Sequence, residues 1–328
     1  MSSIRSLILL LVLACVGHLA VAQTQTSTPQ PTPSPTATPA QPGTTQGDGK
    51  LPTVRVRTDE VNLIFTVVDN DGRFVKDLKQ DQFRILDNNL PPREVLKFEA
   101  QTNLPLRVGM LIDASNSIRD RFKFEQAAAT DFLLENIRPK SDMAFIQAFD
   151  ESPEITQDFT SDLDKLRKGI KSIQPGGGTA LWDAIYYACR EKLLKQQESS
   201  SVRRAIILVS DGDDNQSRVL RKEAIEMAQR AEVIIYAIST SLMNTHEKGS
   251  DNLRALTEAT GGRAFFPVKM DEVTQAFLEI QGELRSQYSV SYRPDRFETN
   301  GQFRAIQIVS VSKKLHTRAK KGYYVPRQ

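Results

Sequence analysis

The sequence predicts an α/β fold in which a doubly wound, mostly parallel sheet is inserted into a β-rich module formed by the N- and C-terminal flanks. Between residues 105 and 286, apolar runs of strand length alternate with segments of helical periodicity. Such alternation is typical of a Rossmann-like parallel sheet with helices on both faces. Outside this region, apolar residues recur at every second position, which is the pattern of half-buried strands.

The central region contains five apolar runs that we expect to be strands. They are residues 108–112, 143–149, 205–209, 233–238 and 264–266. Apolar residues at helical spacing predict helices between these runs, among them residues 122–137 and 221–231 and a final helix over 271–287. Residues 105–286 are therefore expected to form one α/β domain.

The patterns of the two flanks indicate that each supplies half of a single β-rich module. Alternating apolar residues mark strands in both: Val61, Leu63, Phe65 and Val67 in residues 51–104, and Tyr288, Val290 and Tyr292 in residues 287–328. Turns are expected at residues 69–72 and 87–89, which are rich in Asp, Asn and Gly. Neither flank is long enough for a sandwich of its own, and the C-terminal flank follows a helix rather than a linker. We therefore expect the flanks to pair with each other.

The N-terminus has the features of a secretory signal peptide. Arg5 precedes an apolar stretch, and the small residues Ala20 and Ala22 precede Gln23, so residues 1–22 are expected to be removed on export. An alternative is a lipoprotein signal in which Cys15 carries the lipid. Residues 23–50, rich in Pro, Thr and Gln, predict a disordered linker. An extracytoplasmic location follows: secreted, periplasmic or at the cell surface, with membrane association only through an uncleaved signal or a lipid anchor.

Composition and charge point to no particular partner. The 328 residues are 39% apolar, enough for a substantial core, and the formal net charge is only +3. A balance this close to neutral gives no reason to expect nucleic acid as a partner. A cluster of basic residues near the C-terminus is expected to be a solvated strand edge; it contains Lys313, Lys314, Arg318, Lys320 and Lys321.

Oxygen-bearing side chains follow two of the predicted strands and a glycine run. Asp113, Ser115 and Ser117 come directly after residues 108–112, Asp211 follows residues 205–209, and Thr179 follows three glycines. Loops at the carboxyl ends of parallel strands converge on one crevice. Hard oxygen ligands of this kind suit Mg²⁺, with Mn²⁺ or Ca²⁺ as alternatives. The first motif alone could equally be a polar turn in which an Asp or Ser caps the next helix.

The order Asp-x-Ser-x-Ser, Gly-Gly-Thr and Ser-Asp-Gly resembles the von Willebrand factor A (VWA) domain family and its metal-ion-dependent adhesion site. By that resemblance the metal ligands are Asp113, Ser115, Ser117, Thr179 and Asp211. In this family an acidic side chain of a partner protein typically completes the metal coordination. Residues 52–326 are also similar to a family of secreted bacterial proteins, first described from acidobacterial genomes, in which β segments frame an A domain.

The resemblance implies an exported, Mg²⁺-dependent adhesion or protein-binding module rather than an enzyme. Two alternatives remain open: a structural scaffold of an envelope assembly with a metal-stabilised A domain, and a metal-dependent hydrolase. Catalytic patterns are missing, because Ser115 has no Gly-x-Ser-x-Gly context and the glycine run before Thr179 has no lysine for a phosphate-binding loop. Asp213 and Asp214 are expected to be solvated or helix-capping acids rather than ligands.

Overall fold

A computed structural model of the chain describes residues 60–100, 104–116, 121–196, 202–241 and 247–325. The predicted signal peptide (1–22), the predicted linker (23–50) and the predicted ligand Ser117 lie outside these ranges. No helix in the described ranges is both long enough and apolar enough to cross a membrane.

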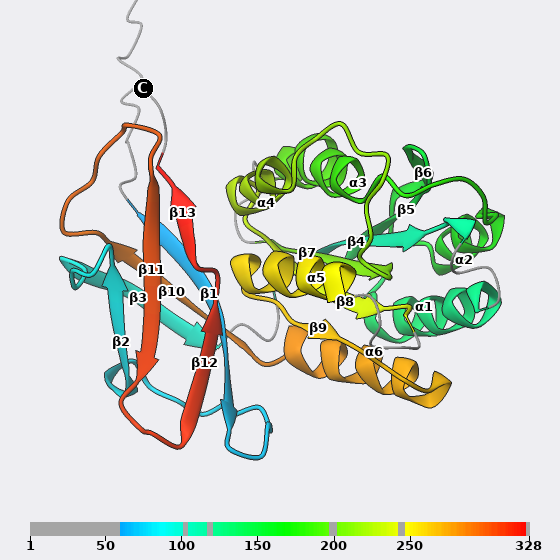
Figure 1. The fold of residues 1–328 in the computed structure, drawn as a ribbon. Coiled ribbons are helices and arrows are strands. Elements are labelled where there is room, and N and C mark those ends of the chain that lie inside the picture. Colours follow the sequence, from blue (N-terminus) through cyan, green and yellow to red (C-terminus); the bar gives the residue numbers. More distant parts are fainter. Residues whose placement is uncertain (1–59, 101–103, 117–120, 197–201, 242–246, 326–328) are drawn as a thin grey trace, which may run out of the picture. The chain divides into compact units, whose positions relative to one another are not determined.

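The central region folds around a six-stranded sheet with the order β6-β5-β4-β7-β8-β9 (Figure 1). Strands β5, β4, β7, β8 and β9 are parallel, and β6 pairs antiparallel with β5 at one edge. The strands are β4 (Leu106–Asp113), β5 (Met143–Phe149), β6 (Pro153–Thr160), β7 (Arg203–Ser210), β8 (Val233–Ser239) and β9 (Ala264–Phe265). The mostly parallel sheet confirms the predicted fold class, whereas β6 is a strand that the sequence pattern did not indicate.

Helices cover both faces of this sheet (Figure 1). One face packs against α1 (Phe122–Asn136), α2 (Leu163–Ser172) and α6 (Met270–Leu284). The other packs against α3 (Leu181–Tyr187), α4 (Arg221–Arg230) and α5 (Glu247–Thr260), and α3 continues through a π-helical turn (Ala188–Leu193) and a 3₁₀ turn (Leu194–Gln196). The final helix ends at Leu284, not at residue 287 as predicted, because Gln287 already begins a strand.

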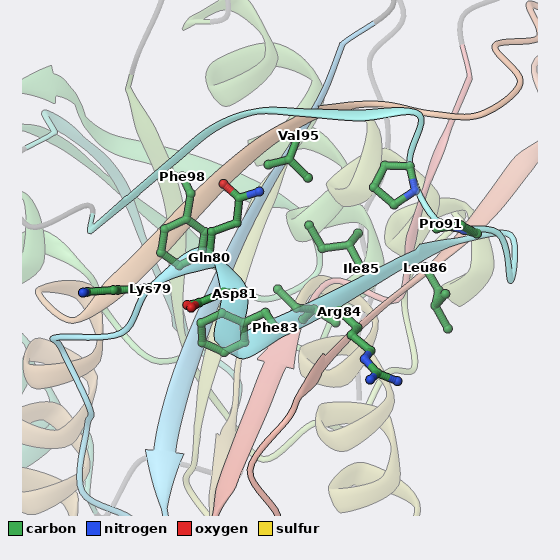
Figure 2. A pocket seen from close by; sticks show the side chains of 12 residues that line it. Lys79, Gln80, Asp81, Phe83, Arg84, Ile85, Leu86, Pro91, Val95 and Phe98 are labelled. Carbon is green, nitrogen blue, oxygen red and sulfur yellow. The ribbon is translucent and has the colours of Figure 1, made fainter.

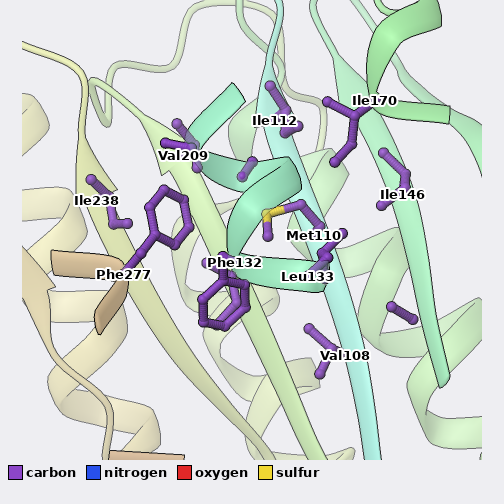
Figure 3. Packing of buried hydrophobic residues seen from close by; sticks show 14 of the residues in the cluster. Val108, Met110, Ile112, Phe132, Leu133, Ile146, Ile170, Val209, Ile238 and Phe277 are labelled. Carbon is purple, nitrogen blue, oxygen red and sulfur yellow. The ribbon is translucent and has the colours of Figure 1, made fainter. Parts of the chain in front are cut away.

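The core between the sheet and α1, α2 and α6 is built from alternate residues of each strand. Val108, Met110 and Ile112 of β4 point to this side, where they meet Phe132 of α1 and Phe277 of α6 (Figure 3). The two phenylalanine rings lie 5.2 Å apart between centroids. Complete burial of each such side chain contributes on the order of 1.5–3 kcal/mol. This core therefore fixes the direction in which β4 delivers Asp113 to the edge of the sheet.

The flanks form one β-rich module of two antiparallel sheets, with the strand orders β12-β1-β10-β3 and β13-β11-β2. The N-terminal flank supplies β1 (Val61–Asp69), a 3₁₀ turn (Gln80–Gln82), β2 (Phe83–Asp87) and β3 (Glu94–Ala100). The C-terminal flank supplies β10 (Gln287–Arg293), β11 (Phe303–Ser310), β12 (Leu315–Ala319) and β13 (Gly322–Tyr324). Strand β1 pairs with β10 and β12, β2 with β11, and β3 with β10. The predicted pairing of the two flanks is confirmed.

The module has an apolar core of its own, formed by alternate strand residues. Val61, Leu63, Phe65 and Val67 of β1 are at most 5% exposed, as the period of two predicts. Phe65 stacks on Tyr288 at 5.4 Å between ring centroids and meets Phe83 of the other sheet edge-on at 5.2 Å. Aromatic contacts therefore join the two sheets.

The turn after β2 follows the expected chemistry. Asn88 and Asn89 have φ angles of 53° and 67°, a left-handed conformation that Asn tolerates better than most residues. This turn places Asp87 in the module core, where its carboxylate accepts hydrogen bonds from the hydroxyls of Tyr292 and Tyr323, each at 2.9 Å, and from Arg304 Nε at 2.6 Å.

The prediction of a solvated edge for the C-terminal basic residues is wrong in part: Lys313, Lys314 and Lys321 are exposed, but Arg318 and Lys320 are partly buried. Arg318 forms an ion pair with the buried carboxylate of Glu283 on α6, which also accepts a hydrogen bond from Thr66 of β1 at 3.2 Å. Lys320 and Lys321 pair with Glu232 at 3.6 Å and with Glu258 at 2.7 Å. These acids belong to the α/β domain, so Arg318, Lys320 and Lys321 bind the β-rich module's C-terminal segment to that domain.

Candidate metal centre

Asp113 lies at the carboxyl end of β4, fully buried. Strands β4 and β7 are parallel neighbours, with Ile112 opposite Val209, so Ser210 at the end of β7 lies beside Asp113. The Asp113 Oδ2 accepts a hydrogen bond from Ser210 Oγ at 2.7 Å, and its Oδ1 accepts one from the backbone N–H of Ser115 at 2.9 Å. These bonds fix the carboxylate at the carboxyl end of β4.

The glycine-rich segment before α3 brings Thr179 to the same edge. The N–H of Gly176 donates to the carbonyl of Ala114 at 2.6 Å, and the N–H of Asn116 donates to the carbonyl of Gly177 at 3.4 Å. Gly177 has a φ of +71°, a backbone conformation that favours glycine. The two segments are therefore held together, and Thr179 is buried, with 4% of its surface exposed.

Asp211 follows β7 on a tightly packed turn. The next residue, Gly212, has a φ of +84°, and a Cβ there would lie 2.3 Å from the carbonyl oxygen of Gly249 on α5. Only glycine allows this approach, and Asn252 Nδ2 donates to the Gly212 carbonyl at 2.9 Å. Asp211 is 7% exposed and its Oδ1 accepts a hydrogen bond from the N–H of Asp213 at 3.0 Å.

Four of the five predicted ligands thus lie in three segments that meet at the carboxyl ends of the central strands: Asp113, Ser115, Thr179 and Asp211. Of the two neighbouring acids, Asp214 caps a helix, as expected, because its Oδ1 accepts a hydrogen bond from the N–H of Leu181 at the start of α3, at 3.0 Å. Asp113 does not cap α1, since its carboxylate bonds Ser115 and Ser210 and α1 begins only at Phe122.

Sequence reasoning missed residues that support these side chains. Asn215 Oδ1 accepts a hydrogen bond from the N–H of Thr179 at 2.9 Å, and Ser210 bonds Asp113 as described. Neither contact has a sequence signal, because each joins distant segments. Glu125 of α1 was also missed, although a Glu among the apolar positions of a helix is visible in the sequence.

Acidic groups are concentrated at this edge. Burial raises the pKa of Asp113 to about 6, against the lowering effect of its bonds to Ser210 and Ser115, and the charge of Asp211 raises it further. Burial raises the pKa of Glu125 to about 8; the charge of Arg121 opposes this, and the charges of Asp113 and Asp211 add to it. A bound cation would relieve the repulsion among these carboxylates.

The residues fit a hard divalent cation. Two carboxylates and hydroxyl groups are the oxygen donors that Mg²⁺ prefers. Two buried oxygens in the surroundings lack a hydrogen-bond partner: Glu125 Oε2, and Thr240 Oγ1, whose residue is tied to Ser210 by a backbone hydrogen bond of 3.2 Å. No group of three or more His, Cys, Asp or Glu side chains in the described ranges is placed to hold a metal ion, so hydroxyls have to complete the ligand set.

A second candidate site is an apolar groove in the β-rich module. The groove has a volume of about 630 Å³ and lies between β2 and β3, where Phe83, Ile85, Val95 and Phe98 line it (Figure 2). Its lining has neither the buried acids nor the convergent hydroxyls of the sheet edge. The groove therefore lacks the ligands for a cation that the carboxyl ends of the parallel strands supply.

Comparison with known proteins agrees with the fold. Residues 108–279 match the family model of the von Willebrand factor type A domain. No curated protein matches the chain. Among solved structures, the chain is similar to the conserved hypothetical protein BatB from Bacteroides thetaiotaomicron, at 18% identity and a TM-score of 0.45 over 55% of this chain and 100% of that one.

Two further solved structures are similar to the chain. One is the proximal thread matrix protein from the mussel byssus with a zinc-occupied MIDAS motif, at 15% identity and a TM-score of 0.49 over 61% of this chain and 50% of that one. The other is the PilB minor pilin from Streptococcus sanguinis, at 14% identity and a TM-score of 0.45 over 57% of this chain and 63% of that one. At these identities the likeness concerns the fold alone.

Proposed function

The chain belongs to the von Willebrand factor type A domain family, and from this premise we propose that it is an exported, Mg²⁺-dependent protein-binding module. In this proposal the metal site consists of Asp113, Ser115, Ser117, Thr179 and Asp211. The ion supplies a Lewis-acidic position that an acidic side chain of the partner protein fills. We further propose that residues 1–22 direct export and that residues 23–50 tether the folded part.

The observation that carries this proposal is the buried pair Asp113 and Asp211 at the meeting point of three loops, beside the hydroxyls of Ser115 and Thr179. Two carboxylates balance the charge of a divalent ion, and the hydroxyls add ligands without adding charge. A neutral site of this kind can still accept one anionic oxygen from outside.

Asp113→Ala should abolish Mg²⁺ binding and leave the fold intact. The substitution removes one of only two charged ligands, and the residue lies at a strand end rather than in the apolar core. Isothermal titration calorimetry measures the binding, and circular dichroism checks the fold. Asp162→Ala is the matched control, because Asp162 caps α2 at the start of that helix and accepts from Asp164 and Lys165. Parent-like Mg²⁺ affinity in Asp113→Ala would rule out the assigned site.

Partner binding should require both the ion and Asp113. The parent protein, incubated with envelope extract of its source, is expected to retain a partner in Mg²⁺, to lose it in EDTA and to regain it when Mg²⁺ is restored. Asp113→Ala should retain none, and Asp162→Ala should behave like the parent. If the same partner is retained in EDTA and by Asp113→Ala, the metal does not mediate recognition, and the scaffold function replaces the one proposed.

A further inference from the structure

Glu125 occupies a position on α1 that apolar residues otherwise fill. Helix α1 buries Phe122, Ala129 and Phe132 against the sheet, and Glu125 lies on the same stripe with only 3% of its surface exposed. Burying a carboxylate among apolar groups costs several kcal/mol unless hydrogen bonds or a counter-charge compensate. The chain therefore places an ionisable carboxyl group where a Leu or Ala would stabilise the core more.

The surroundings of Glu125 compensate its burial only in part: the charge of Arg121 opposes the effect of burial, yet the pKa of Glu125 stays raised. Its Oε2 is buried and has no hydrogen-bond partner. The contrast is Glu283 on α6, which is equally buried but accepts hydrogen bonds from Thr66 at 3.2 Å and from Tyr236 at 3.0 Å and pairs with Arg318. A buried Glu with a purely structural role resembles Glu283.

Glu125 does interact electrostatically with the proposed metal site. The carboxylates of Asp113 and Asp211 are close enough to affect it, although the three acids are not arranged to bind one ion together. Glu125 therefore lies within electrostatic range of the site without forming a three-carboxylate ligand cluster with Asp113 and Asp211. Mg²⁺ usually keeps some of its waters, and those waters donate hydrogen bonds to acceptors around the site.

We propose that Glu125 is a positioning residue of the metal site, and that its free carboxylate oxygen accepts a hydrogen bond from a water bound to the ion. This inference rests on the proposed function, because it requires a cation at Asp113 and Asp211. It explains both the orphaned oxygen and the location of a charge on an apolar helix face. It also means that a third carboxyl group supports the ion while only two carboxylates coordinate it.

The test compares Glu125→Gln with Glu283→Gln, which is the matched control because both change one buried Glu to its amide. Glu125→Gln should weaken Mg²⁺ binding by roughly 10- to 100-fold, as loss of an outer contact to a metal site typically does. The thermal midpoint of the metal-free protein should not fall, because Oε2 has no hydrogen bond there to lose. Glu283→Gln should lower the thermal midpoint and leave the Mg²⁺ affinity unchanged. Calorimetric titration and thermal unfolding in EDTA supply the two measurements.

The outcomes separate this inference from the proposed function. Equal Mg²⁺ affinity in the parent and in Glu125→Gln would overturn the inference alone. Absence of Mg²⁺ binding in the parent would overturn the proposed function and the inference with it. If Glu125→Gln does not fold, Glu125→Asp keeps the charge but withdraws it by one methylene, and it should bind Mg²⁺ more weakly than the parent. Parent-like affinity in that variant would also contradict the role.

Discussion

Residues 51–104, produced without the rest of the chain, should show no cooperative unfolding transition. Each strand of this flank obtains its ladder from the C-terminal flank: β1 from β10 and β12, β2 from β11, and β3 from β10. Within the described residues, the flank itself forms only isolated bridges, Val68 with Phe74 and Asp87 with Leu90. Strands without partners do not hold a sheet in water. Circular dichroism during urea titration measures the result.

Joining the two flanks directly should restore folding. Ala100, the last residue of β3, pairs with Tyr288 of β10 in an antiparallel ladder, so the chain leaves and re-enters the β-rich module at neighbouring positions. A turn of about four residues between Ala100 and Tyr288 could therefore replace the whole α/β domain. A cooperative transition in this joined protein, and none in residues 51–104, is the expected pair of results. Cooperative folding of residues 51–104 alone would mean that the flanks are independent domains.

The sequence predicted most strands because one face of each is buried. Period-two patterns located β1 and β10, and apolar runs located β4 and β7. Strand β6 was missed because it begins with Pro153 and lies at an edge, where polar residues such as the half-buried Gln157 and the exposed Asp158 remove the signal. Pairing of the flanks could be predicted because neither is long enough for a sandwich of its own. The register of the paired strands could not, because it depends on side-chain packing that no local pattern encodes.

The candidate site likewise has residues that the sequence predicted and supporting contacts that it did not. Asp113, Ser115, Thr179 and Asp211 were predictable because each ends a recognisable strand or glycine run. Their supporting contacts could not be predicted, because each joins residues far apart in the sequence. Ser210 bonds Asp113, 97 positions away, and Asn215 bonds Thr179, 36 positions away. The basic cluster shows the opposite error: Arg318 looked solvated because nothing in its own segment indicates Glu283. Glu125 alone carried an unused signal, a charge on an apolar stripe.

Asp87→Ala should lower the free energy of unfolding of the β-rich module by about 3–5 kcal/mol, the usual cost of removing one partner from a buried ion pair. Asp87 and Arg304 are 1% and 8% exposed, so the guanidinium would stay buried without its counter-charge. Burial raises the pKa values of Tyr292 and Tyr323, so both hydroxyls keep their protons and would lose their acceptor. Tyr292 belongs to one sheet and Tyr323 to the other, and the carboxylate joins them.

Urea titration with two signals measures this effect. Far-UV circular dichroism reports both parts of the protein, whereas fluorescence of Trp182, the single tryptophan, reports the α/β core. In Asp87→Ala the dichroism should begin to change at lower urea than the fluorescence, because the module loses its buried pair while the core around Trp182 keeps its contacts. Asp87→Asn, which retains an acceptor oxygen, should fall between this variant and the parent. Asp81→Ala is the exposed control and should match the parent within about 0.5 kcal/mol. Coincident transitions at the parental midpoint in Asp87→Ala would mean that this carboxylate does not hold the two sheets together.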